Sequence, residues 1–368
     1  MNEIAVIDQL KSCGIDVVLS LPCDKNKAFT SELYNYFSVV DLTREEDGVG
    51  ISAGLALTKR KFVMSIQSSG IGNMVNAMLS LTRVYSLPLP ILASWRGVQN
   101  ESIEAQVPFN SRILGLLDNY DIGYTIITDE ADIPKIADAI SEAYANNEIH
   151  VILIKPGLWG ASADTNIDYP ERKASMSLNI SREYPQPVMK RLDAIRCLMS
   201  NIDDDTAVVS NIGVPSKEVY AVMDRSLNFY MLGSYTQATP IGIGIALGTD
   251  RHVCVIDGDG SLLGSSVLPV LASLNLKNLT IICLDNGTFG STGNQMNQAY
   301  SVSNIEFMAR ACGIADTVSA STENEIDDVM KEYHEFIHIR IAPGNSLSKN
   351  LLLSASDIKE RFMSSIIR

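Results

Sequence analysis

The sequence predicts an α/β protein built from two doubly wound parallel-sheet domains. Short apolar segments alternate with amphipathic segments from one end of the 368-residue chain to the other. That alternation is typical of parallel strands whose sheet is covered by helices on both faces. The chain is also long for a single hydrophobic core and has an ordinary length for two domains.

Four apolar runs in the first half predict buried strands, and the segments between them carry apolar residues at helical spacing. The runs lie at 17–21, 62–66, 90–94 and 151–154, and the clearest helical segments lie at 50–59 and 133–145. The second half repeats this scheme, with apolar runs at 207–209, 252–256 and 279–284. Each half should therefore form its own parallel sheet.

A polar stretch that contains prolines and has no periodicity separates the two halves at 161–187. Such a composition predicts a linker rather than a helix or a strand. We therefore expect a first domain at 1–165, a linker at 166–190 and a second domain at 191–368.

The two halves end in similar sequences. IHVILIKPG occupies 149–157, and IHIRIAPG occupies 337–344. Duplication of one ancestral domain would explain this similarity. Chance explains it equally well, because short strands followed by Pro-Gly are common.

Charge and composition exclude several classes of function. Asp and Glu outnumber Lys and Arg by 43 to 29, which gives a net charge of -14 without any basic cluster. Nucleic acid is therefore not an expected partner, and an anionic substrate would need a local basic pocket. The six cysteines are scattered, as in reduced cytoplasmic proteins. No apolar run approaches bilayer length and the first residues do not resemble a signal segment, so we expect a cytoplasmic protein without membrane contact.

Polar residues follow two apolar runs of the second half, where the carboxyl ends of parallel strands would bring them together. Gly258-Asp259-Gly260 follows the first run, and after 25 intervening residues Asn286-Gly287-Thr288 follows the next. One edge of the sheet would then present the carboxylate of Asp259, the amide oxygen of Asn286 and a carbonyl of the loop. Such oxygen ligands suit Mg²⁺ that carries a diphosphate. Two unrelated turns are the alternative, since Asp, Asn and Gly are common in turns.

These two strand ends, with their spacing, resemble the diphosphate- and magnesium-binding signature of thiamine-diphosphate enzymes. The resemblance implies thiamine diphosphate and Mg²⁺ as cofactors, and two domains of the thiamine-diphosphate-binding type. It places the metal on Asp259, Asn286 and Thr288. The cofactor-binding residues that it implies in this half are Gly233, Ser234, Tyr235, Gly258, Asp259, Gly260, Ser261, Asn286 and Thr288.

Tyr235 departs from the pattern of this family. The family usually has Gly-Ser-Met-Gly where this chain has Gly-Ser-Tyr-Thr at 233–236. The methionine is similar to the bulky apolar residue that wedges the cofactor into its bent shape. A tyrosine can fill the same volume, so we expect Tyr235 to be the wedge, but its hydroxyl then needs a hydrogen-bond partner.

The first half offers a carboxylate for the other end of the cofactor. An acidic segment at 45–47 follows a strand-like run and precedes a helix rich in small residues. It resembles the pyrimidine-binding domain of thiamine-diphosphate decarboxylases, in which the catalytic glutamate stands nine residues before a helix glycine. Counted back from Gly54, that position is Glu45, which the resemblance assigns to the aminopyrimidine ring. A solvated acidic helix start is the alternative, and it would fit Glu46 or Asp47 equally well.

Similarity to the sulfopyruvate and phosphonopyruvate decarboxylases extends over nearly the whole chain. It is carried by the segments 67–73, 94–97, 291–295 and 343–345, while 43–46 and 103–106 are more similar to the sulfopyruvate branch. The chain resembles the two subunits of many archaeal enzymes fused in order. The resemblance implies decarboxylation of 3-sulfopyruvate to sulfoacetaldehyde in coenzyme M biosynthesis, with phosphonopyruvate as the alternative substrate. It also implies a homodimer or larger homo-oligomer with active sites between subunits.

Three residues of the first half are candidates for contact with the anionic 2-oxoacid. Asp24 resembles the active-site aspartate of pyruvate-type decarboxylases and would return a proton after carbon dioxide leaves, although an ordinary turn aspartate fits equally well. Arg96 is the best candidate to bind a sulfonate, because its planar guanidinium matches an anion with several oxygens. Gln67 is the third. Lys25 and Lys27 fit a solvated loop better.

Two other classes of function fit the sequence less well. Oxidative decarboxylation, as in 2-oxoacid:ferredoxin oxidoreductases, needs iron-sulfur clusters, for which the scattered cysteines offer no ligand set. A binding protein without turnover is hard to reconcile with Glu45, Asp259 and Asn286 together. None of the four histidines falls in a motif, so we expect packed or surface positions for them. Proton transfer should then rely on a carboxylate, water or the cofactor's amino group.

Overall fold

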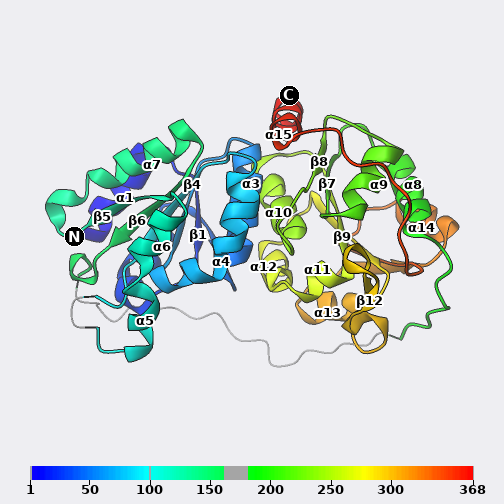
Figure 1. Ribbon diagram of the computed structural model, residues 1–368, viewed down its shortest axis with the longest axis horizontal. Helices are drawn as coiled ribbons and strands as arrows, with labels where there is room; N and C mark the ends of the chain where they lie inside the picture. Colours follow the sequence, from blue (N-terminus) through cyan, green and yellow to red (C-terminus); the bar gives the residue numbers. More distant parts are fainter. Residues whose placement is uncertain (1, 99–100, 161–180, 368) are drawn as a thin grey trace. The chain divides into compact units, whose positions relative to one another are not determined.

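The computed structural model describes residues 2–98, 101–160 and 181–367, which form two compact units (Figure 1). The first unit spans Met1–Lys173 and the second spans Ala174–Arg368. The division falls within 161–180, outside the described residues, so the predicted limits of the linker stay a prediction. Residues 181–190, expected to be the end of that linker, belong to the second unit and form no helix or strand.

The first unit is a six-stranded parallel sheet with helices on both faces. Its strands are β1 (Val17–Ser20), β2 (Ser38–Asp41), β3 (Phe62–Gln67), β4 (Leu89–Ser94), β5 (Gly123–Ile127) and β6 (Ile149–Ile154). Its helices are α1 (Asn2–Ser12), α2 (Lys27–Leu33), α3 (Glu45–Leu57), α4 (Ile71–Ala77), α5 (Val107–Asn110), α6 (Ile113–Asn119) and α7 (Lys135–Asn146).

The strand order in this sheet is β2-β1-β3-β4-β6-β5, and every neighbouring pair is parallel. Helices α1 and α7 pack together on one face, and α3 and α4 pack together on the other (Figure 1). This is the predicted doubly wound arrangement. It collects the carboxyl ends of all six strands at one edge, where ligands bind in folds of this kind.

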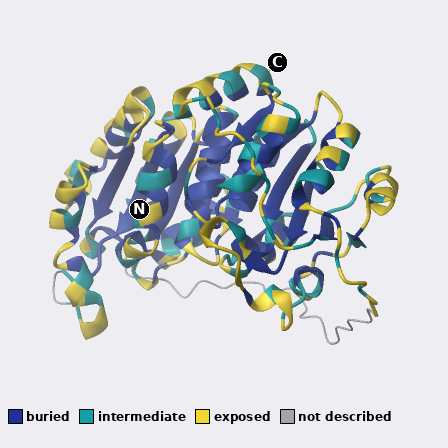
Figure 2. Cartoon of the chain, turned by 45° about the vertical axis from the view of Figure 1, so that its right-hand side comes forward, coloured by how far each residue is buried: buried dark blue, intermediate teal, exposed yellow. Residues whose placement is uncertain are grey.

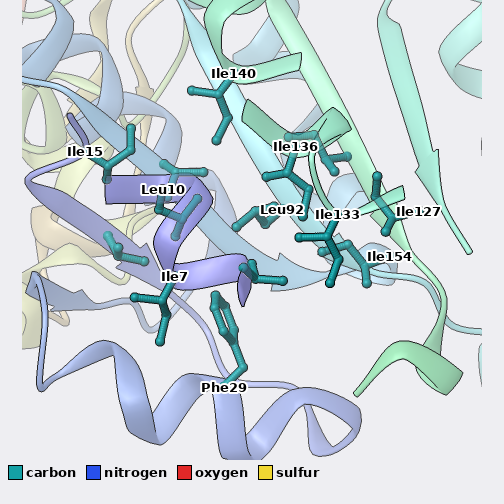
Figure 3. Close-up of a cluster of buried hydrophobic side chains, with 14 of the residues drawn as sticks. Ile7, Leu10, Ile15, Phe29, Leu92, Ile127, Ile133, Ile136, Ile140 and Ile154 are labelled. Atoms are coloured by element: carbon teal, nitrogen blue, oxygen red, sulfur yellow. The ribbon is translucent and has the colours of Figure 1, made fainter. Parts of the chain in front are cut away.

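A core of apolar side chains fixes α1, α2 and α7 on the first sheet (Figure 3). Ile7 and Leu10 come from α1, Phe29 from α2, and Ile136 and Ile140 from α7, and all five are buried. The spacing of three or four residues within α1 and α7 is that of an apolar helix face. Burial of each such side chain contributes about 1.5–3 kcal/mol. These contacts stabilise the first sheet, whose strand ends carry the candidate site residues of this unit.

The second unit has the same architecture. Its strands are β7 (Ala207–Ser210), β8 (Asn228–Tyr230), β9 (Val253–Gly258), β10 (Leu279–Asp285), β13 (Thr317–Ala320) and β14 (Phe336–Arg340), with a small hairpin of β11 (Thr288–Phe289) and β12 (Gln295–Met296). Its helices are α8 (Arg191–Asn201), α9 (Val214–Val222), α10 (Ala238–Gly248), α11 (Asp259–Leu263), α12 (Val267–Leu274), α13 (Ile305–Ala311), α14 (Glu323–Val329) and α15 (Ala355–Ile366).

The two sheets share one topology. The second sheet has the order β13-β14-β10-β9-β7-β8. When the six strands of each sheet are counted along the chain, both sheets read 2-1-3-4-6-5. The repeated sequences at 149–157 and 337–344 begin in β6 and β14, which hold the same place in their sheets. The shared topology favours duplication over chance as the origin of that similarity.

Exposed residues gather on the outer faces of the helices and in the loops, while the central strands are buried (Figure 2). Among the residues that the structure describes, no helix has the length and apolar character needed to cross a membrane.

Candidate active site

The carboxyl edge of the second sheet surrounds a pocket of about 190 Å³. Strand β9 ends at Gly258 and α11 begins at Asp259, while β10 ends directly before Asn286. The pocket is lined by the predicted residues Tyr235, Gly258, Asp259, Gly260, Ser261, Asn286 and Thr288, and also by Arg191, Asn211, Asp257 and Phe289. The residues expected to bind a diphosphate are thus brought together, and Gly233 and Ser234 lead into Tyr235 at its wall.

Asp259 is a buried carboxylate with little positive charge to compensate it. Its Oδ2 accepts a hydrogen bond from Nδ2 of Asn297 at 2.7 Å. Burial, reinforced by the nearby charge of Asp285, raises the pKa of Asp259 to about 7. Burial also raises the pKa of Asp257, which lines the same pocket. Carboxylates in this state gain strongly from a bound cation, which offsets the unfavourable burial of their charge.

The turn after β10 presents Asn286 and Thr288 through a fixed set of hydrogen bonds. Oδ1 of Asp285 accepts from the backbone N–H of Gly287 at 2.9 Å, and Oδ1 of Asn286 accepts from that of Thr288 at 3.0 Å. Gly287 has a φ of 65°, and a Cβ there would lie 2.8 Å from Cα of Tyr300. Only glycine therefore suits this position.

The donor set fits a magnesium diphosphate. Oγ1 of Thr288 and Oγ of Ser234 are buried and have no hydrogen-bond partner, which leaves them available to a ligand. Within the described residues, no group of three or more His, Cys, Asp or Glu side chains is arranged to hold a metal ion. A metal beside Asp259 would therefore depend on amide, hydroxyl and backbone oxygens, which suit Mg²⁺ and not Zn²⁺.

Tyr235 stands in a strained segment of backbone. Ser234 and Thr236, on either side of it, have φ values of 70° and 74°, a conformation that residues other than glycine rarely adopt. Strain of this kind persists only where the surroundings enforce it, and it is concentrated at functional sites. The hydroxyl of Tyr235 donates to the carbonyl of Gly260, so the partner that the sequence required lies in the loop expected to bind the diphosphate.

Arg191 is a pocket residue that the sequence did not reveal. It is the first residue of α8, far from any strand end, so no motif marks it. Its Nε donates to Oε2 of Glu218 at 2.7 Å, and its Nη2 donates to Oδ1 of Asn345 at 2.9 Å. The guanidinium therefore has a fixed position on the wall of the pocket.

Glu45 is the first residue of α3 in the first unit, and it is buried. Its Oε2 accepts from Nδ2 of Asn73 at 3.0 Å, and a side chain at Gly70 would collide with its carboxylate. Glu46, the neighbour that the sequence could not exclude, instead pairs with Arg44 at 3.1 Å. Of these two glutamates, Glu45 is therefore the one held in a built polar environment.

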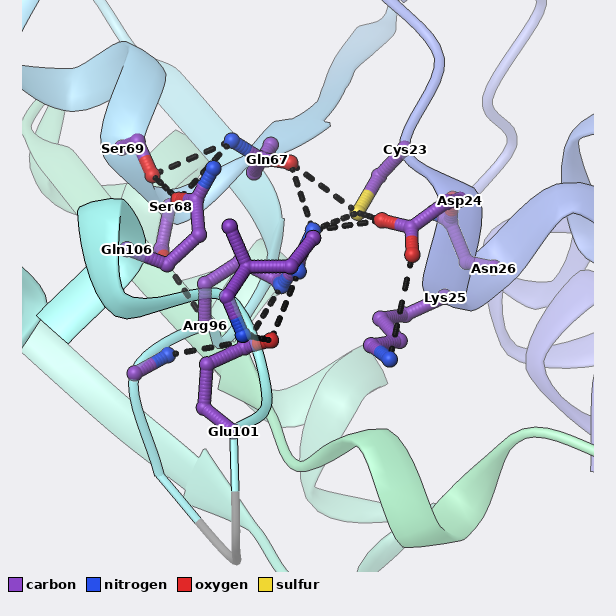
Figure 4. Close-up of polar contacts among 12 residues, drawn as sticks. Cys23, Asp24, Lys25, Asn26, Gln67, Ser68, Ser69, Arg96, Glu101 and Gln106 are labelled. Carbon is purple, nitrogen blue, oxygen red and sulfur yellow. Dashed lines mark hydrogen bonds and ion pairs between the residues drawn. The ribbon is translucent and has the colours of Figure 1, made fainter.

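Arg96 follows β4 and joins Asp24 and Gln67 in one cluster (Figure 4). It is 1% exposed. Its Nε and Nη2 donate to the two carboxylate oxygens of Glu101 at 2.7 and 3.0 Å, while Nη1 donates to Oε1 of Gln67 at 3.0 Å and to Asp24. The hydrogen bonds from Arg96 lower the pKa of Glu101 to about 2. The two-point face of the guanidinium, expected to meet the substrate, is therefore occupied by Glu101.

Gln67 connects this cluster to a second group of polar side chains. Its Nε2 donates to Oγ of Ser69 at 3.1 Å and to Oε1 of Gln106 at 3.2 Å. Because both ends of the amide are engaged, its orientation is fixed. The three substrate candidates of the first unit thus form one hydrogen-bonded network, in which only the Asp24 side chain is more than half exposed.

The shared topology, the oxygen-lined pocket of one unit and the buried helix-start glutamate of the other define the class of thiamine pyrophosphate enzymes. Residues 3–122 match the family described as thiamine pyrophosphate enzyme, N-terminal TPP binding domain. Residues 212–339 match the corresponding C-terminal TPP binding domain. The predicted type of both domains is thus confirmed, and thiamine diphosphate is supported as a cofactor.

The chain belongs to the sulfopyruvate decarboxylase family within this class. It is 40% identical to sulfopyruvate decarboxylase of Methanosarcina acetivorans, over 98% of this chain and 96% of that one. It is 30% identical to phosphonopyruvate decarboxylase of Streptomyces viridochromogenes, over 91% and 87% of the two chains. Sulfopyruvate decarboxylase subunit beta of Methanocaldococcus jannaschii is 39% identical over 49% of this chain and 98% of that subunit. The protein is therefore a thiamine-pyrophosphate-dependent decarboxylase, as the sequence predicted.

Proposed function

We propose that this enzyme decarboxylates 3-sulfopyruvate without oxidation, giving sulfoacetaldehyde and carbon dioxide. The observation that carries the proposal is the 40% identity to a sulfopyruvate decarboxylase over nearly the full length of both chains. The phosphonopyruvate decarboxylase is more distant, at 30% identity. The complete set of Glu45, Asp259 and Asn286 supports turnover rather than binding alone.

The second unit holds the cofactor. Asp259, Asn286 and Thr288 would bind Mg²⁺, and the loop at 258–261 would hold the diphosphate, with Tyr235 packed against it. When bound, thiamine diphosphate supplies the electron sink for the negative charge that remains as carbon dioxide leaves. The negative charge of Asp257, Asp259 and Asp285 favours a divalent cation at this edge over the bare diphosphate.

Glu45 holds a proton at the pyrimidine end. Asn73 donates to its Oε2 and leaves Oε1 as the free oxygen of the carboxylate. This oxygen lies against Gly70, where a larger residue would displace it. Oε1 would exchange a proton with the aminopyrimidine ring of the cofactor.

The network around Arg96 meets the anionic end of the substrate. Because Glu101 occupies Nε and Nη2, and Gln67 and Asp24 occupy Nη1, Arg96 would attract the sulfonate through its positive charge and through the partners that it orients. Asp24, as the carboxylic acid, would give its proton to the carbon that carbon dioxide leaves, and its exposed side chain would then take up a proton from water. Lys25, whose Nζ lies 3.8 Å from Asp24, adds positive charge to a cluster that would otherwise repel a dianion.

The functional assembly is a homodimer or larger homo-oligomer, with each active site formed between subunits. Relatives of the second half exist as a separate beta subunit, which supports a site that draws on two modules. In a fused chain, the same arrangement is obtained when Glu45 of one copy serves the cofactor held by Asp259 of another.

A side-by-side assay of sulfopyruvate, phosphonopyruvate and pyruvate tests the substrate. We expect carbon dioxide release to be fastest from sulfopyruvate, and removal of Mg²⁺ with EDTA to stop it. Faster turnover of phosphonopyruvate would assign the enzyme to that reaction instead. If none of the three acids is consumed with both cofactors present, the proposed function is wrong.

A further inference from the structure

His338 is a buried histidine that does not line the cofactor pocket. It lies in β14 and is 1% exposed. Its Nε2 is 2.8 Å from Oδ2 of Asp285, which is also buried. A buried imidazole against a buried carboxylate is costly unless the pair is well placed, so this contact calls for a reason.

The contact follows from the register of the sheet. His338 pairs with Cys283 and Arg340 pairs with Asp285 across β14 and β10. Because side chains alternate between faces, His338 and Asp285 lie on the same face as diagonal neighbours. Asp285 is the last residue of β10, so its carboxylate reaches back to the imidazole at the point where the turn to Asn286 begins.

Asp285 transmits this contact to the turn. Its Oδ2 is held by His338, and its Oδ1 accepts the backbone N–H of Gly287 at 2.9 Å. Both oxygens of one carboxylate are thus used to fix the residues on either side of Asn286. Rotation of the Asp285 side chain would break the bond to Gly287 and release the turn that presents Asn286 and Thr288.

The imidazole is itself held from its other side. The ring of Tyr184 packs edge-on against it, with ring centroids 6.1 Å apart. The hydroxyl of Tyr184 accepts from Asn304 at 3.0 Å and donates to Glu306 at 3.1 Å, while the Arg340 guanidinium lies over its ring at 4.7 Å. His338 therefore stands between a fixed aromatic ring and Asp285, with little freedom to turn.

We infer that His338 is a positioning residue that holds the Asp285 carboxylate and thereby sets the magnesium-binding turn. It would touch neither the metal nor the substrate. The inference rests on the magnesium site proposed above. Groups that directly contact a metal ligand typically account for 10–100-fold in metal affinity. His338 acts one contact further out, through Asp285, so we expect an effect near the lower end of that range.

The first sheet offers a matched control. His150 lies in β6, the strand that corresponds to β14, and belongs to the equivalent repeat. Its Nε2 is 2.9 Å from Oγ1 of Thr125, so it contacts a hydroxyl and no metal-bearing turn. The same substitution at His150 therefore reports the general cost of altering a packed histidine in this fold.

Asparagine and glutamine separate the two ring nitrogens of His338. The amide nitrogen of Gln lies near the position of Nε2 and can still reach Asp285, whereas that of Asn lies near the position of Nδ1 and cannot. Titration of Mg²⁺ into the full-length protein with thiamine diphosphate, followed by calorimetry, should show at least about tenfold weaker binding for His338→Asn. His338→Gln should stay within about threefold of the wild type, as should His150→Asn.

Three outcomes would overturn the positioning role, and a fourth concerns the magnesium site itself. Wild-type Mg²⁺ affinity in His338→Asn, or an equal loss in His338→Asn and His338→Gln, would overturn the positioning role. A loss in His150→Asn as large as that in His338→Asn would show a general packing effect and would overturn it as well. If the wild-type protein itself binds no Mg²⁺, the magnesium site fails first, which distinguishes that failure from the others.

Discussion

The two sheets of this protein have the same strand order, yet their carboxyl edges carry opposite electrostatics. At the carboxyl edge of the second sheet, Asp257 and Asp259 are buried and accept hydrogen bonds from the uncharged side chains of Thr239 and Asn297. The pKa of Asp259 rises to about 7. At the carboxyl edge of the first sheet, Arg96 binds the carboxylates of Asp24 and Glu101 directly. The pKa of Glu101 falls to about 2. The same strand order thus offers one edge that needs a cation and one edge that is already neutralised. This difference supports the proposal that the second unit binds the metal and diphosphate and that the first unit binds the substrate.

The largest effect, a loss of cofactor affinity, is expected when an oxygen ligand is removed at the carboxyl edge of the second sheet. Asp259→Ala or Asn286→Ala removes an oxygen ligand, so magnesium-dependent binding of thiamine diphosphate should weaken by about 100-fold or more while the fold survives. Calorimetry with circular dichroism as the folding check measures this. Gln67→Ala, at the corresponding strand end of the first sheet, is the control and should keep its cofactor affinity. Unchanged affinity in both variants of the second edge would remove the metal from this site.

Glu45→Gln tests the first edge without touching the metal. The amide keeps the shape of the side chain but cannot exchange a proton with the ring, so cofactor should still bind while kcat falls by about 100-fold or more. Glu46→Gln is the matched control, because Glu46 pairs with Arg44 and should be replaceable at little cost. Steady-state kinetics with saturating cofactor decides between the two residues. The reverse pattern would mean that Glu46 is the catalytic residue.

Arg96→Lys tests how the enzyme recognises the sulfonate of its substrate. Lysine keeps the charge but cannot bind both oxygens of Glu101 while it also reaches Gln67 and Asp24. We expect kcat/KM for sulfopyruvate to fall by roughly tenfold, about 1.4 kcal/mol, and the preference over pyruvate to shrink with it. An unchanged ratio of the two kcat/KM values would show that Arg96 does not recognise the sulfonate. Lys25 would then be the next residue to replace.

The smallest effect is expected on the stability of the first unit and on how that stability changes with pH. Because Arg96 depresses the pKa of Glu101 in the folded state, ionised Glu101 stabilises the first unit above the unfolded pKa of 4.5. That contribution is lost as the pH falls toward about 2. Glu101→Gln should therefore lower the melting temperature at pH 7, and the difference from the wild type should shrink between about pH 4.5 and 2. A difference that is the same across this range would mean that Glu101 stabilises by shape and not by charge.

Much of the fold could be predicted because buried parallel strands have a continuous apolar sequence. The strands expected in the first half appear as β1, β3, β4 and β6, with ends shifted by at most two residues. The edge strands were not predicted. Only one of the four residues of β2 is buried, so it has no apolar run, and β8 has only three residues.

The helix that carries Glu45 shows a second limit of the sequence. Apolar periodicity predicts a helix at 50–59, whereas α3 begins at Glu45. Its first turn is acidic, and Gly48 and Gly50 follow, so the periodic pattern begins only after Glu45, the residue proposed to be catalytic. Resemblance to a family, and not helical spacing, identified Glu45.

Most of the residues that hold the site together could not be predicted, because they lie far along the chain from their partners. Asn297 reaches Asp259 across 38 positions, and Asn73 reaches Glu45 across 28. Glu101 is only five residues from Arg96, but the sequence of this loop does not indicate that both carboxylate oxygens accept hydrogen bonds from the guanidinium. His338 was expected to have a packed or surface position, and its contact with Asp285 depends on the register of β14 and β10, which could not be predicted from the sequence.

Complementation between two inactive variants tests most directly whether each active site combines the first unit of one copy of the chain with the second unit of another. Glu45→Gln and Asp259→Ala are each expected to be nearly inactive. If an active site takes Glu45 from one copy and Asp259 from another, co-expressed variants form mixed dimers in which one of two sites is intact. Random pairing then restores about a quarter of wild-type activity, measured as carbon dioxide released from sulfopyruvate. Activity no higher than that of the separate variants would contradict this account and would place both residues of each site in a single copy.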